Sequence, residues 1–269
     1  MRKIILMLAL LSPYLTAVFG QASEQTDKVI YVCPPCGDDC DKIEFDKPGA
    51  CPKCGMTLVQ KSLAEFRKEQ NFKPVSVCFY IQDGIDLLDF AGPMEVFSTA
   101  GFKVFTVSKT KNNIHTQNSL SVTPEYLLQD VPAADVLVIS GGNISPTMND
   151  PEVIKWIQAR QKTSQYTLSV CTGAFILGKA NILDGLSATT WYQEINNLAK
   201  ANPNTKVVDN TRYVDNGNVI TTAGVAAGID GALHLVEKIR GRNYAKGTSQ
   251  AIQYDKWDPV QGLLIGNDK

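Results

Sequence analysis

The spacing of the cysteines near the start of the chain constrains its fold most, because it demands cross-links or a metal ion. Four of the seven cysteines form two pairs in the pattern C-x2-C-x14-C-x2-C. Each pair can turn both thiolates toward one ion, and two such turns complete a tetrahedral site. A unit of about thirty residues cannot bury enough surface to fold unaided. The predicted metal ligands are Cys33, Cys36, Cys51 and Cys54.

Other interpretations of these cysteines stay open. Two disulfides could hold the same unit, and four cysteines allow three connectivities. Cys40, which has acidic residues on both sides, is either a spare thiol or an alternative ligand. Thiolates bind zinc, but they also favour copper(I) and other soft ions, so the spacing does not choose the metal. The predicted cofactor is therefore zinc or another soft heavy-metal ion, held in a ribbon over residues 28–60.

The second cysteine pair lies within a longer motif, PGACPKCGM, at residues 48–56. This motif resembles the heavy-metal-binding ribbon found beside metal-efflux and other exported bacterial proteins. Members of that family often have a histidine where Cys36 stands, so this chain resembles an all-cysteine variant. The resemblance implies a small zinc-ribbon-like unit that binds a metal ion.

The first 22 residues have the pattern of a secretory signal peptide. Arg2 and Lys3 precede an uncharged, mostly apolar run over residues 4–19, which ends in small residues. A retained membrane anchor is the alternative, but Pro13 interrupts the run and a polar segment follows it. We therefore expect a periplasmic or secreted protein with no membrane partner after cleavage.

The rest of the chain has the composition of a globular α/β protein. Its formal net charge of −1 gives no reason to expect a nucleic-acid partner. After a charged linker helix at 61–73, short β-branched runs alternate with helical segments over 74–241, and a tail follows at 242–269. This alternation is typical of βαβ units and a mostly parallel sheet.

The hydrophobic pattern places the expected elements, and Asn216-Gly217 is typical of a hairpin turn. The expected strands are 75–81, 103–108, 135–140, 166–170, 188–190, 206–208, 212–215 and 218–222. The expected helices are 92–100, 151–161, 172–180, 191–200 and 224–240, with prolines in the first turns of the first two.

Cys171 is the candidate nucleophile because it stands between a predicted strand end and a predicted helix start. At such an elbow, backbone N–H groups and the helix dipole favour an anion, so we expect a lowered thiol pKa. The sharp turn also presents the side chain at the carboxyl edge of the sheet. Cys78, by contrast, lies within a predicted strand and is expected to be a packing residue.

Two further segments should meet Cys171 at the same edge. Gly141 and Gly142 follow a buried strand, and glycines let backbone N–H groups approach an oxyanion closely. Asp86 and Asp89 open the first helix of the domain. A simple N-terminal cap explains Asp86 best, whereas for Asp89 a functional role is favoured over a cap.

The segments VCTGA at 170–174 and LDFAGP at 88–93, together with the Gly pair, resemble the DJ/PfpI (ThiJ) superfamily, in its isonitrile-hydratase and AraC-sensor-like branch. The resemblance covers about residues 73–240 and implies a flavodoxin-like, class I glutamine amidotransferase-like parallel sheet with helices on both faces. It also implies a homodimer. On matching positions it implies Cys171 as nucleophile, Asp89 as the acid hydrogen-bonded to the sulfur, and an oxyanion hole from the N–H groups of Thr172, Gly141 and Gly142.

The chain departs from this family at Trp191 and Tyr192, where many relatives have a histidine. Its two histidines, His115 and His234, are expected to be structural, so a Cys-His dyad is doubtful. The predicted function is hydration or hydrolysis of a small electrophilic substrate, isonitrile-hydratase-like or glyoxalase-like. A non-catalytic small-ligand or redox sensor and a metal-handling protein are the alternatives. A DNA-binding regulator is disfavoured because no helix-turn-helix pattern follows the domain.

Overall fold

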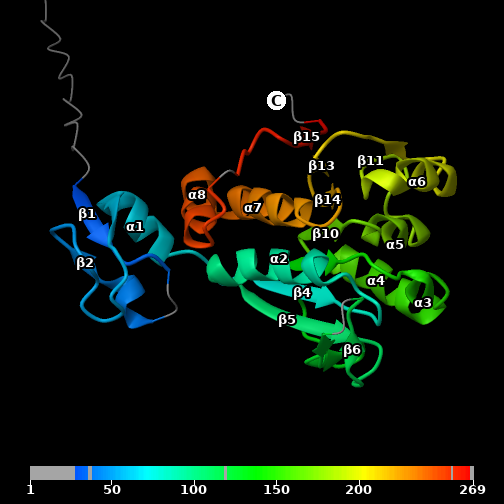
Figure 1. Ribbon diagram of the computed structural model, residues 1–269, viewed down its shortest axis with the longest axis horizontal. Helices are drawn as coiled ribbons and strands as arrows, with labels where there is room; N and C mark the ends of the chain where they lie inside the picture. Colours follow the sequence, from blue (N-terminus) through cyan, green and yellow to red (C-terminus); the bar gives the residue numbers. More distant parts are fainter. Residues whose placement is uncertain (1–27, 36–37, 118–119, 256, 267–269) are drawn as a thin grey trace, which may run out of the picture.

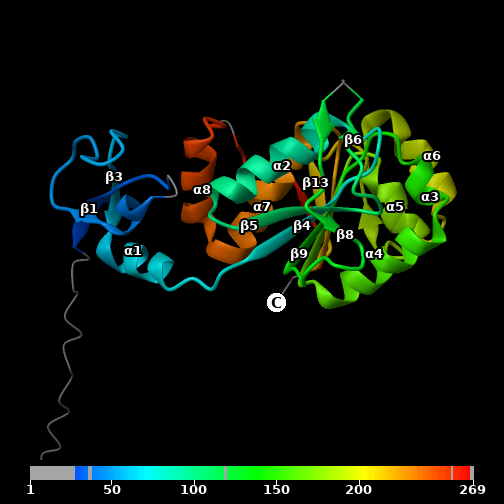
Figure 2. The same cartoon turned by 90° about the horizontal axis from the view of Figure 1, so that it is seen from below.

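The computed structural model describes residues 28–35, 38–117, 120–255 and 257–266, which form a small ribbon and a larger α/β domain (Figure 1). The predicted signal peptide, residues 1–22, lies outside the described residues. Among the helices that the structure describes, none is long and apolar enough to span a membrane. The ribbon lies at one end of the molecule, beside helix α8 (Arg242–Ala251) of the larger domain (Figure 2).

The ribbon is built on a three-stranded antiparallel sheet in the order β2-β1-β3. Val29 pairs with Ser62, so the sheet includes residues 61 and 62, which the sequence analysis assigned to the linker. The ribbon contains the strands β1 (Val29–Val32), β2 (Glu44–Phe45) and β3 (Val59–Ser62) and the 3-10 turn η1 (Asp39–Lys42).

Helix α1 (Leu63–Gln70) follows β3 directly and belongs to the ribbon's own core. The Ser62 hydroxyl accepts a hydrogen bond from the Glu65 N–H at 3.1 Å, which caps the helix. Phe66 packs against Ile30 and Val32 of β1, so the helix covers one face of the sheet. The expected linker segment is therefore helical in its middle, with a strand before it.

The large domain is built on an eight-stranded sheet with a parallel core in the order β5-β4-β9-β10-β14. Numbered along the chain, these core strands run 2-1-3-4-5, which is the flavodoxin-like order. Each overlaps a predicted strand, so the predicted fold class is confirmed. The core strands are β4 (Ser76–Tyr80), β5 (Lys103–Ser108), β9 (Val136–Ile139), β10 (Tyr166–Val170) and β14 (Val219–Thr222).

Shorter strands complete the sheet edges. At one edge β8 (Tyr126–Leu127) pairs with β5. At the other, β13 (Tyr213–Asp215) pairs antiparallel with β14, and β15 (Leu263–Leu264) pairs parallel with β13. The segment at 242–269 therefore supplies both a helix and an edge strand. The remaining short strands are β6 (Ile114–His115), β7 (Ser121–Val122), β11 (Ser187–Ala188) and β12 (Lys206–Val207).

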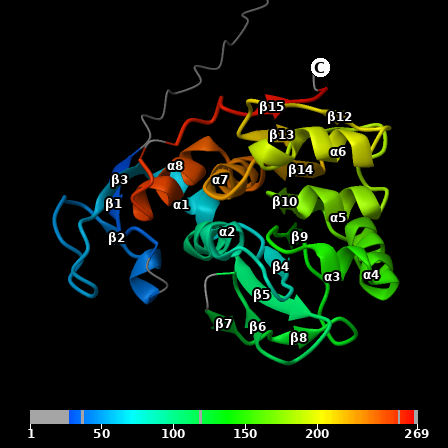
Figure 3. The ribbon, with the colours of Figure 1, turned by 45° about the vertical axis from the view of Figure 1, so that its right-hand side comes forward.

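Helices cover both faces of this sheet (Figure 3). Alternate residues of β4 show the division, because Val77 and Phe79 pack toward α2 and α7, whereas Cys78 and Tyr80 pack toward α4 and α5. Cys78 is thus a packing residue, as predicted. One face carries α2 (Leu87–Thr99) and α7 (Ala227–Arg240), with α8 against α7; the other carries α3 (Ser145–Met148), α4 (Pro151–Thr163), α5 (Gly173–Lys179) and α6 (Ile195–Ala201).

Two helices begin furthest from their expected first residues. Helix α2 starts at Leu87 instead of residue 92, because Asp86 caps it by accepting from the Leu88 N–H at 3.2 Å. The cap role predicted for Asp86 is confirmed, but Pro93 lies inside the helix and not in its first turn. The helix expected from residue 191 begins as a 3-10 turn, η2 (Tyr192–Glu194), before α6.

Candidate functional site

Cys171 occupies a strained elbow between β10 and α5. Its φ of +57° lies in the left-handed region that side chains other than glycine rarely adopt. The Thr190 hydroxyl donates to the Cys171 carbonyl at 2.7 Å, and the Cys171 N–H donates to the Ala223 carbonyl at 3.2 Å. The turn is tight enough that a Cβ on Gly173 would lie 2.3 Å from the Ile139 carbonyl oxygen. The predicted sharp elbow is therefore present.

Asp89 lies beside this elbow and is fully buried, with 0 % of its surface exposed. Its Oδ1 accepts from the Val225 N–H at 3.0 Å. Burial, and then the negative charge of Asp86, raise the pKa of Asp89 to about 7, although the Cys171 thiol and the N–H groups of Val225 and Gly141 oppose the rise. Its Oδ2 has no hydrogen bond among the described residues, although the Cys171 thiol and the Gly141 N–H lie near the carboxyl group. Asp89 can therefore gain or lose a proton near neutral pH.

Pro93 helps to fix the backbone of Asp89. A proline inside a helix removes the N–H that would bond to the carbonyl four residues earlier, which here belongs to Asp89. The Ser140 hydroxyl donates to that carbonyl at 3.2 Å and replaces the missing bond. Ser140 is fully buried and follows β9 directly, so this contact ties the start of α2 to the sheet edge.

The electrostatics of Cys171 differ from the prediction. Burial, and then the negative charge of Asp89, raise the pKa of the Cys171 thiol to about 12, although the Thr172 N–H opposes the rise. The sequence analysis expected a lowered pKa from the helix terminus. That expectation was wrong because the thiol is only 7 % exposed and faces a carboxylate, two effects that outweigh one backbone donor. At neutral pH the resting pair is a thiol beside a partly ionised carboxyl group.

The three predicted oxyanion donors are near the elbow, but they are not free to face one oxyanion. The Gly142 N–H donates to the Thr172 hydroxyl at 3.0 Å, and the same hydroxyl donates to the Gly142 carbonyl at 3.1 Å. The Gly141 N–H is directed to Asp89, and the Thr172 N–H to the Cys171 sulfur. The Gly142 N–H is therefore occupied by the Thr172 hydroxyl in this arrangement and does not face an oxyanion.

A cleft of about 770 Å³ lies next to the elbow. Its lining includes Trp191, which stands near the position where the sequence analysis noted a histidine in many relatives. Trp191 packs on Gly224, where an added Cβ would lie 2.5 Å from the indole Cδ1. Val225 has a φ of +54°, which is strained for a β-branched residue. Its role as the donor to Asp89 was not predicted from the sequence. The cleft is lined by Thr189, Thr190, Trp191, Tyr192, Asp209, Asn210, Thr211, Arg212, Ala223, Gly224, Val225, Ala226 and Gln261.

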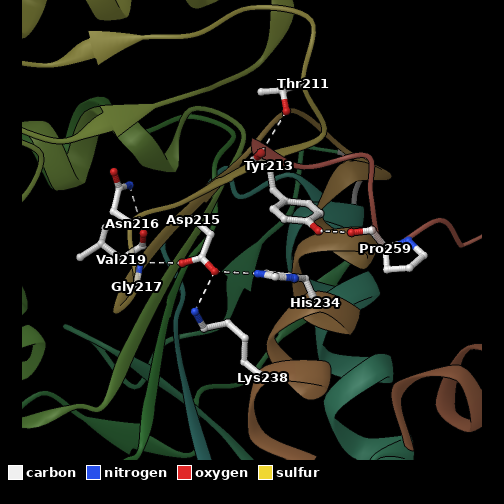
Figure 4. Close-up of polar contacts among 9 residues, drawn as sticks. All are labelled: Thr211, Tyr213, Asp215, Asn216, Gly217, Val219, His234, Lys238 and Pro259. Carbon is white, nitrogen blue, oxygen red and sulfur yellow. Dashed lines mark hydrogen bonds and ion pairs between the residues drawn. The ribbon is translucent and has the colours of Figure 1, made fainter. Parts of the chain in front are cut away.

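Neither histidine has a hydrogen bond to Cys171 or Asp89 among the described residues. His234 is buried in α7, and its Nε2 contacts the Asp215 carboxylate at 2.7 Å (Figure 4). Lys238 bonds to the same oxygen at 2.7 Å, and the Tyr213 ring stacks on the imidazole. His115 is exposed and pairs with Asp83 through its Nδ1 at 3.3 Å. Both histidines therefore serve structural contacts, as predicted.

The ribbon gathers four sulfur atoms at one point. The sulfurs of Cys33, Cys40, Cys51 and Cys54 all lie within 4.8 Å of one another. Those of Cys33 and Cys54 are 3.2 Å apart, which is longer than the roughly 2.05 Å of a disulfide. Four sulfurs at about 2.3 Å from a tetrahedral ion would be about 3.8 Å apart. The cluster therefore fits a thiolate-bound ion. Cys36, a predicted ligand, lies outside the described residues.

The strand order and the cysteine elbow define a flavodoxin-like α/β protein with a buried thiol at the carboxyl edge of its sheet. The chain belongs to the DJ-1/PfpI family, whose sequence model matches residues 75–238. A model of the heavy metal binding domain matches residues 30–61. Both resemblances drawn from the sequence are confirmed.

Similar proteins include an enzyme and a regulator. The chain is 32 % identical to an isonitrile hydratase of Pseudomonas putida over 67 % of this chain and 78 % of that one. It is 24 % identical to the HTH-type transcriptional regulator GbdR of Pseudomonas aeruginosa over 70 % of this chain, but it spans only 53 % of the regulator. A solved ThiJ/PfpI family protein from Pseudomonas syringae has a TM-score of 0.64 at 27 % identity, covering 70 % of this chain and 78 % of that one.

Proposed function

We propose that the DJ-1/PfpI domain hydrates a small electrophilic compound, of which an isonitrile is the best-supported class. Cys171 is the nucleophile and Asp89 carries the proton. The observation that carries the proposal is the buried Asp89 carboxyl group, whose pKa of about 7 lets it act as both base and acid beside the thiol. Similarity to an isonitrile hydratase supports the choice of substrate class.

The raised thiol pKa changes the mechanism that the sequence suggested. A preformed thiolate is disfavoured beside the Asp89 carboxylate, so Asp89 must act as a general base when substrate binds. The Cys171 thiol passes its proton to Asp89, and its sulfur bonds to the terminal carbon of the isonitrile. Asp89 then delivers that proton to the same carbon, which leaves a thioimidate.

Water completes the proposed reaction and regenerates the thiol. Asp89 takes a proton from water and passes it to the substrate nitrogen, while the hydroxyl group bonds to the thioimidate carbon. When the C–S bond breaks, the hydroxyl proton returns to Cys171 and an N-substituted formamide leaves. One isonitrile and one water are consumed, and no oxidant or reductant is needed. Trp191 and Tyr192 border the adjoining cleft and would select the substituent on nitrogen.

The experiment that tests this proposal follows formamide release from a panel of alkyl and aryl isonitriles. The rate should rise as the pH increases through about 7, because Asp89 must be ionised to accept the thiol proton. Asp89→Asn should lower the rate by about 10²–10⁴-fold and abolish that inflection. Cys171→Ala should remove activity, whereas Cys78→Ala is a matched control that removes a buried thiol outside the site.

Alkylation of Cys171 gives an independent measurement on the same variants. Removing the Asp89 charge should lower the thiol pKa, because that charge helps to raise it. Asp89→Asn should therefore speed alkylation at alkaline pH while it slows hydration. If no isonitrile yields a formamide, or if Asp89→Asn changes neither the hydration rate nor the alkylation rate, the catalytic proposal fails.

A non-catalytic small-ligand or redox sensor is the second candidate function. Two features favour a sensor: the Gly142 N–H already bonds to the Thr172 hydroxyl, and the thiol is protonated at neutral pH. The similarity to a transcriptional regulator is compatible with this role. A sensor would bind a compound in the cleft without turnover, and Cys171→Ala would keep that affinity. If the protein is an enzyme, the Cys171→Ala variant would form no product.

We further propose that the protein is exported to the periplasm or beyond, acts as a homodimer, and binds a soft heavy-metal ion in its ribbon. The leader pattern supports export, and the sulfur cluster supports metal binding. A metal-handling role, the third candidate, would require rapid metal exchange. A structural ion would exchange slowly, so competition with a coloured chelator separates these two roles of the ribbon.

A further inference from the structure

One three-residue segment contacts both Cys171 and Asp89. This segment, residues 223–225, is named the strap, and it lies between the end of β14 and the start of α7. At its first residue, the Ala223 carbonyl accepts a hydrogen bond from the Cys171 N–H at 3.2 Å. At its last residue, the Val225 N–H donates to Asp89 Oδ1 at 3.0 Å. Any shift of the strap would therefore change the surroundings of the thiol and of the carboxyl group together.

The strap needs support from its neighbours, because its backbone is strained at Val225. A φ of +54° is unfavourable for a β-branched residue, and it persists only when surrounding contacts impose it. The hydrogen bond to Asp89 is one such contact. The Val225 carbonyl also accepts from the Gly228 N–H at 3.2 Å. Both contacts are made at Val225 itself, so the support at the middle residue of the strap, Gly224, comes from another element.

Trp191 provides that support at Gly224. A Cβ added to Gly224 would lie 2.5 Å from Cδ1, 3.2 Å from Cγ and 3.4 Å from Cβ of Trp191. Since these three nearest atoms all belong to one side chain, the tryptophan packs directly on the backbone of Gly224. The φ of Gly224 lies outside the left-handed region. The close approach of Trp191, and not the backbone conformation, therefore explains why this position is a glycine.

The chain that carries Trp191 is itself attached to the elbow. The Thr190 hydroxyl donates to the Cys171 carbonyl at 2.7 Å, and the Thr189 N–H donates to the Thr221 hydroxyl at 2.9 Å. Thr189 and Thr190 are buried, whereas Trp191 is half-buried and lines the cleft. The tryptophan thus has a fixed backbone, one contact on the strap and one border with the cleft.

We propose that Trp191 is a positioning residue that holds the strap against Asp89 and Cys171. It acts through the backbone of Gly224 and Val225 and does not itself transfer a proton. This role goes beyond the proposed hydration, because it concerns how the thiol and the carboxyl group are arranged and is the same in an enzyme or a sensor. A compound bound in the cleft would then lie against the residue that positions the pair.

Amide NMR of the full chain tests this role, with the Val225 amide proton as the reporter. A hydrogen bond to a carboxylate is stronger than one to a neutral acid. The Val225 resonance should therefore move downfield as the pH rises through about 7, where Asp89 ionises. Asp89→Asn should abolish this pH response, which assigns it to that group and not to Asp86 or Cys171. Trp191→Ala should lose most of the response, because the strap is then free to move away from Asp89.

Two variants separate positioning from the mere loss of an aromatic ring. Trp191→Phe keeps Cβ, Cγ and a ring near Gly224, so it should retain most of the Val225 response. Tyr192→Ala removes an aromatic side chain that lines the same cleft but is 68 % exposed, and it should retain the full response. If Trp191→Ala keeps the response, or if either of these two variants loses as much of it as Trp191→Ala does, the proposal is wrong.

Gly224→Ala is a second test, which leaves Trp191 in place and covers the case in which Trp191→Ala does not fold. Its added Cβ meets the indole, so the strap must shift and the Val225 response should fall. Gly247→Ala, where an added Cβ has open space, is the matched control and should leave the response unchanged. In the double variant with Trp191→Ala, the Cβ enters space that the indole has vacated, so the combined loss should be smaller than the sum of the two single losses. A full Val225 response in Gly224→Ala, or strictly additive losses, would contradict the proposal.

Discussion

The ribbon and the α/β domain both place cysteines at tight turns, yet their surroundings move the thiol pKa in opposite directions. In the ribbon, the backbone N–H of Cys54 is the largest influence on Cys51 and lowers its pKa to about 7. At the elbow, burial and a neighbouring carboxylate raise the pKa of Cys171 to about 12. A turn alone therefore does not activate a thiol. The pKa of the thiol depends on which charges and hydrogen-bond donors the rest of the fold brings to the sulfur.

This contrast matches the different chemistry that the two sites would perform. A metal site needs thiolates, because the deprotonated sulfur is the ligand. A site that adds a thiol to a neutral electrophile can instead keep the proton until substrate arrives, provided that a base is in contact. In the proposed mechanism Asp89 is that base, and the elbow and the carboxyl group would act as one unit.

The largest difference between the two regions should appear when metal is removed. Under reducing conditions, a chelator should unfold the ribbon over residues 29–62, since metal binding supplies roughly 10–16 kcal/mol of folding free energy to such units. Backbone hydrogen exchange should become fast there and stay slow in β4, β9 and β10. If the ribbon stays protected when the chelator is used without reductant and loses protection only when reductant is added, disulfides hold it instead.

A packing change within the α/β domain should alter the stability of that domain and leave the ribbon unaffected. Gly173→Ala places a Cβ against the Ile139 carbonyl, a backbone atom that cannot move aside cheaply. We expect the free energy of unfolding of the α/β domain to fall by about 1–3 kcal/mol. Gly247→Ala in α8, where no atom lies within 4 Å, should raise it by about 0.5–1 kcal/mol. Urea denaturation measures both, and zinc affinity should change in neither variant.

The smallest expected effect concerns the Thr172 hydroxyl, which bonds to both the N–H and the carbonyl of Gly142. Thr172→Val leaves these two groups without partners and should lower the free energy of unfolding by about 1–2 kcal/mol. Thr172→Ser keeps the hydroxyl group and should lose less. Equal losses in urea denaturation would show that the methyl group, and not the hydroxyl bridge, holds the elbow together.

The fold was predictable because its signals are local. Runs such as 166–170 and 219–222 are β-branched and apolar, and their spacing with intervening helices favours a parallel sheet. The short strands β6, β7, β8 and β15 were not predicted, since two residues carry no periodic pattern. Helix α2 was placed too late because Pro93 was taken as a start, whereas Asp86 supplies the cap.

The candidate sites were less predictable because their contacts are distant in sequence. Asp89 and Val225, which share a hydrogen bond, are 136 residues apart. Burial and this contact set the pKa of Asp89, and neither can be obtained from spacing. In the ribbon, the fold also brings Cys40, which stands outside the two C-x2-C pairs, into the described sulfur cluster. Cys33, Cys51 and Cys54 in the ribbon, like Cys171 and Asp89 in the larger domain, belong to local motifs, and the fold brings the members of each set together.

The last strand of the chain has a consequence for solubility. A sheet edge with unpaired N–H and carbonyl groups is a template for pairing between molecules. Strand β15 covers the edge of β13 by pairing with Val214 and Asp215, and the Tyr213 hydroxyl donates to the Pro259 carbonyl at 2.9 Å. The segment that leads to the C-terminus thus shields its own domain from edge-to-edge aggregation, with a two-residue strand too short to offer much of a new template.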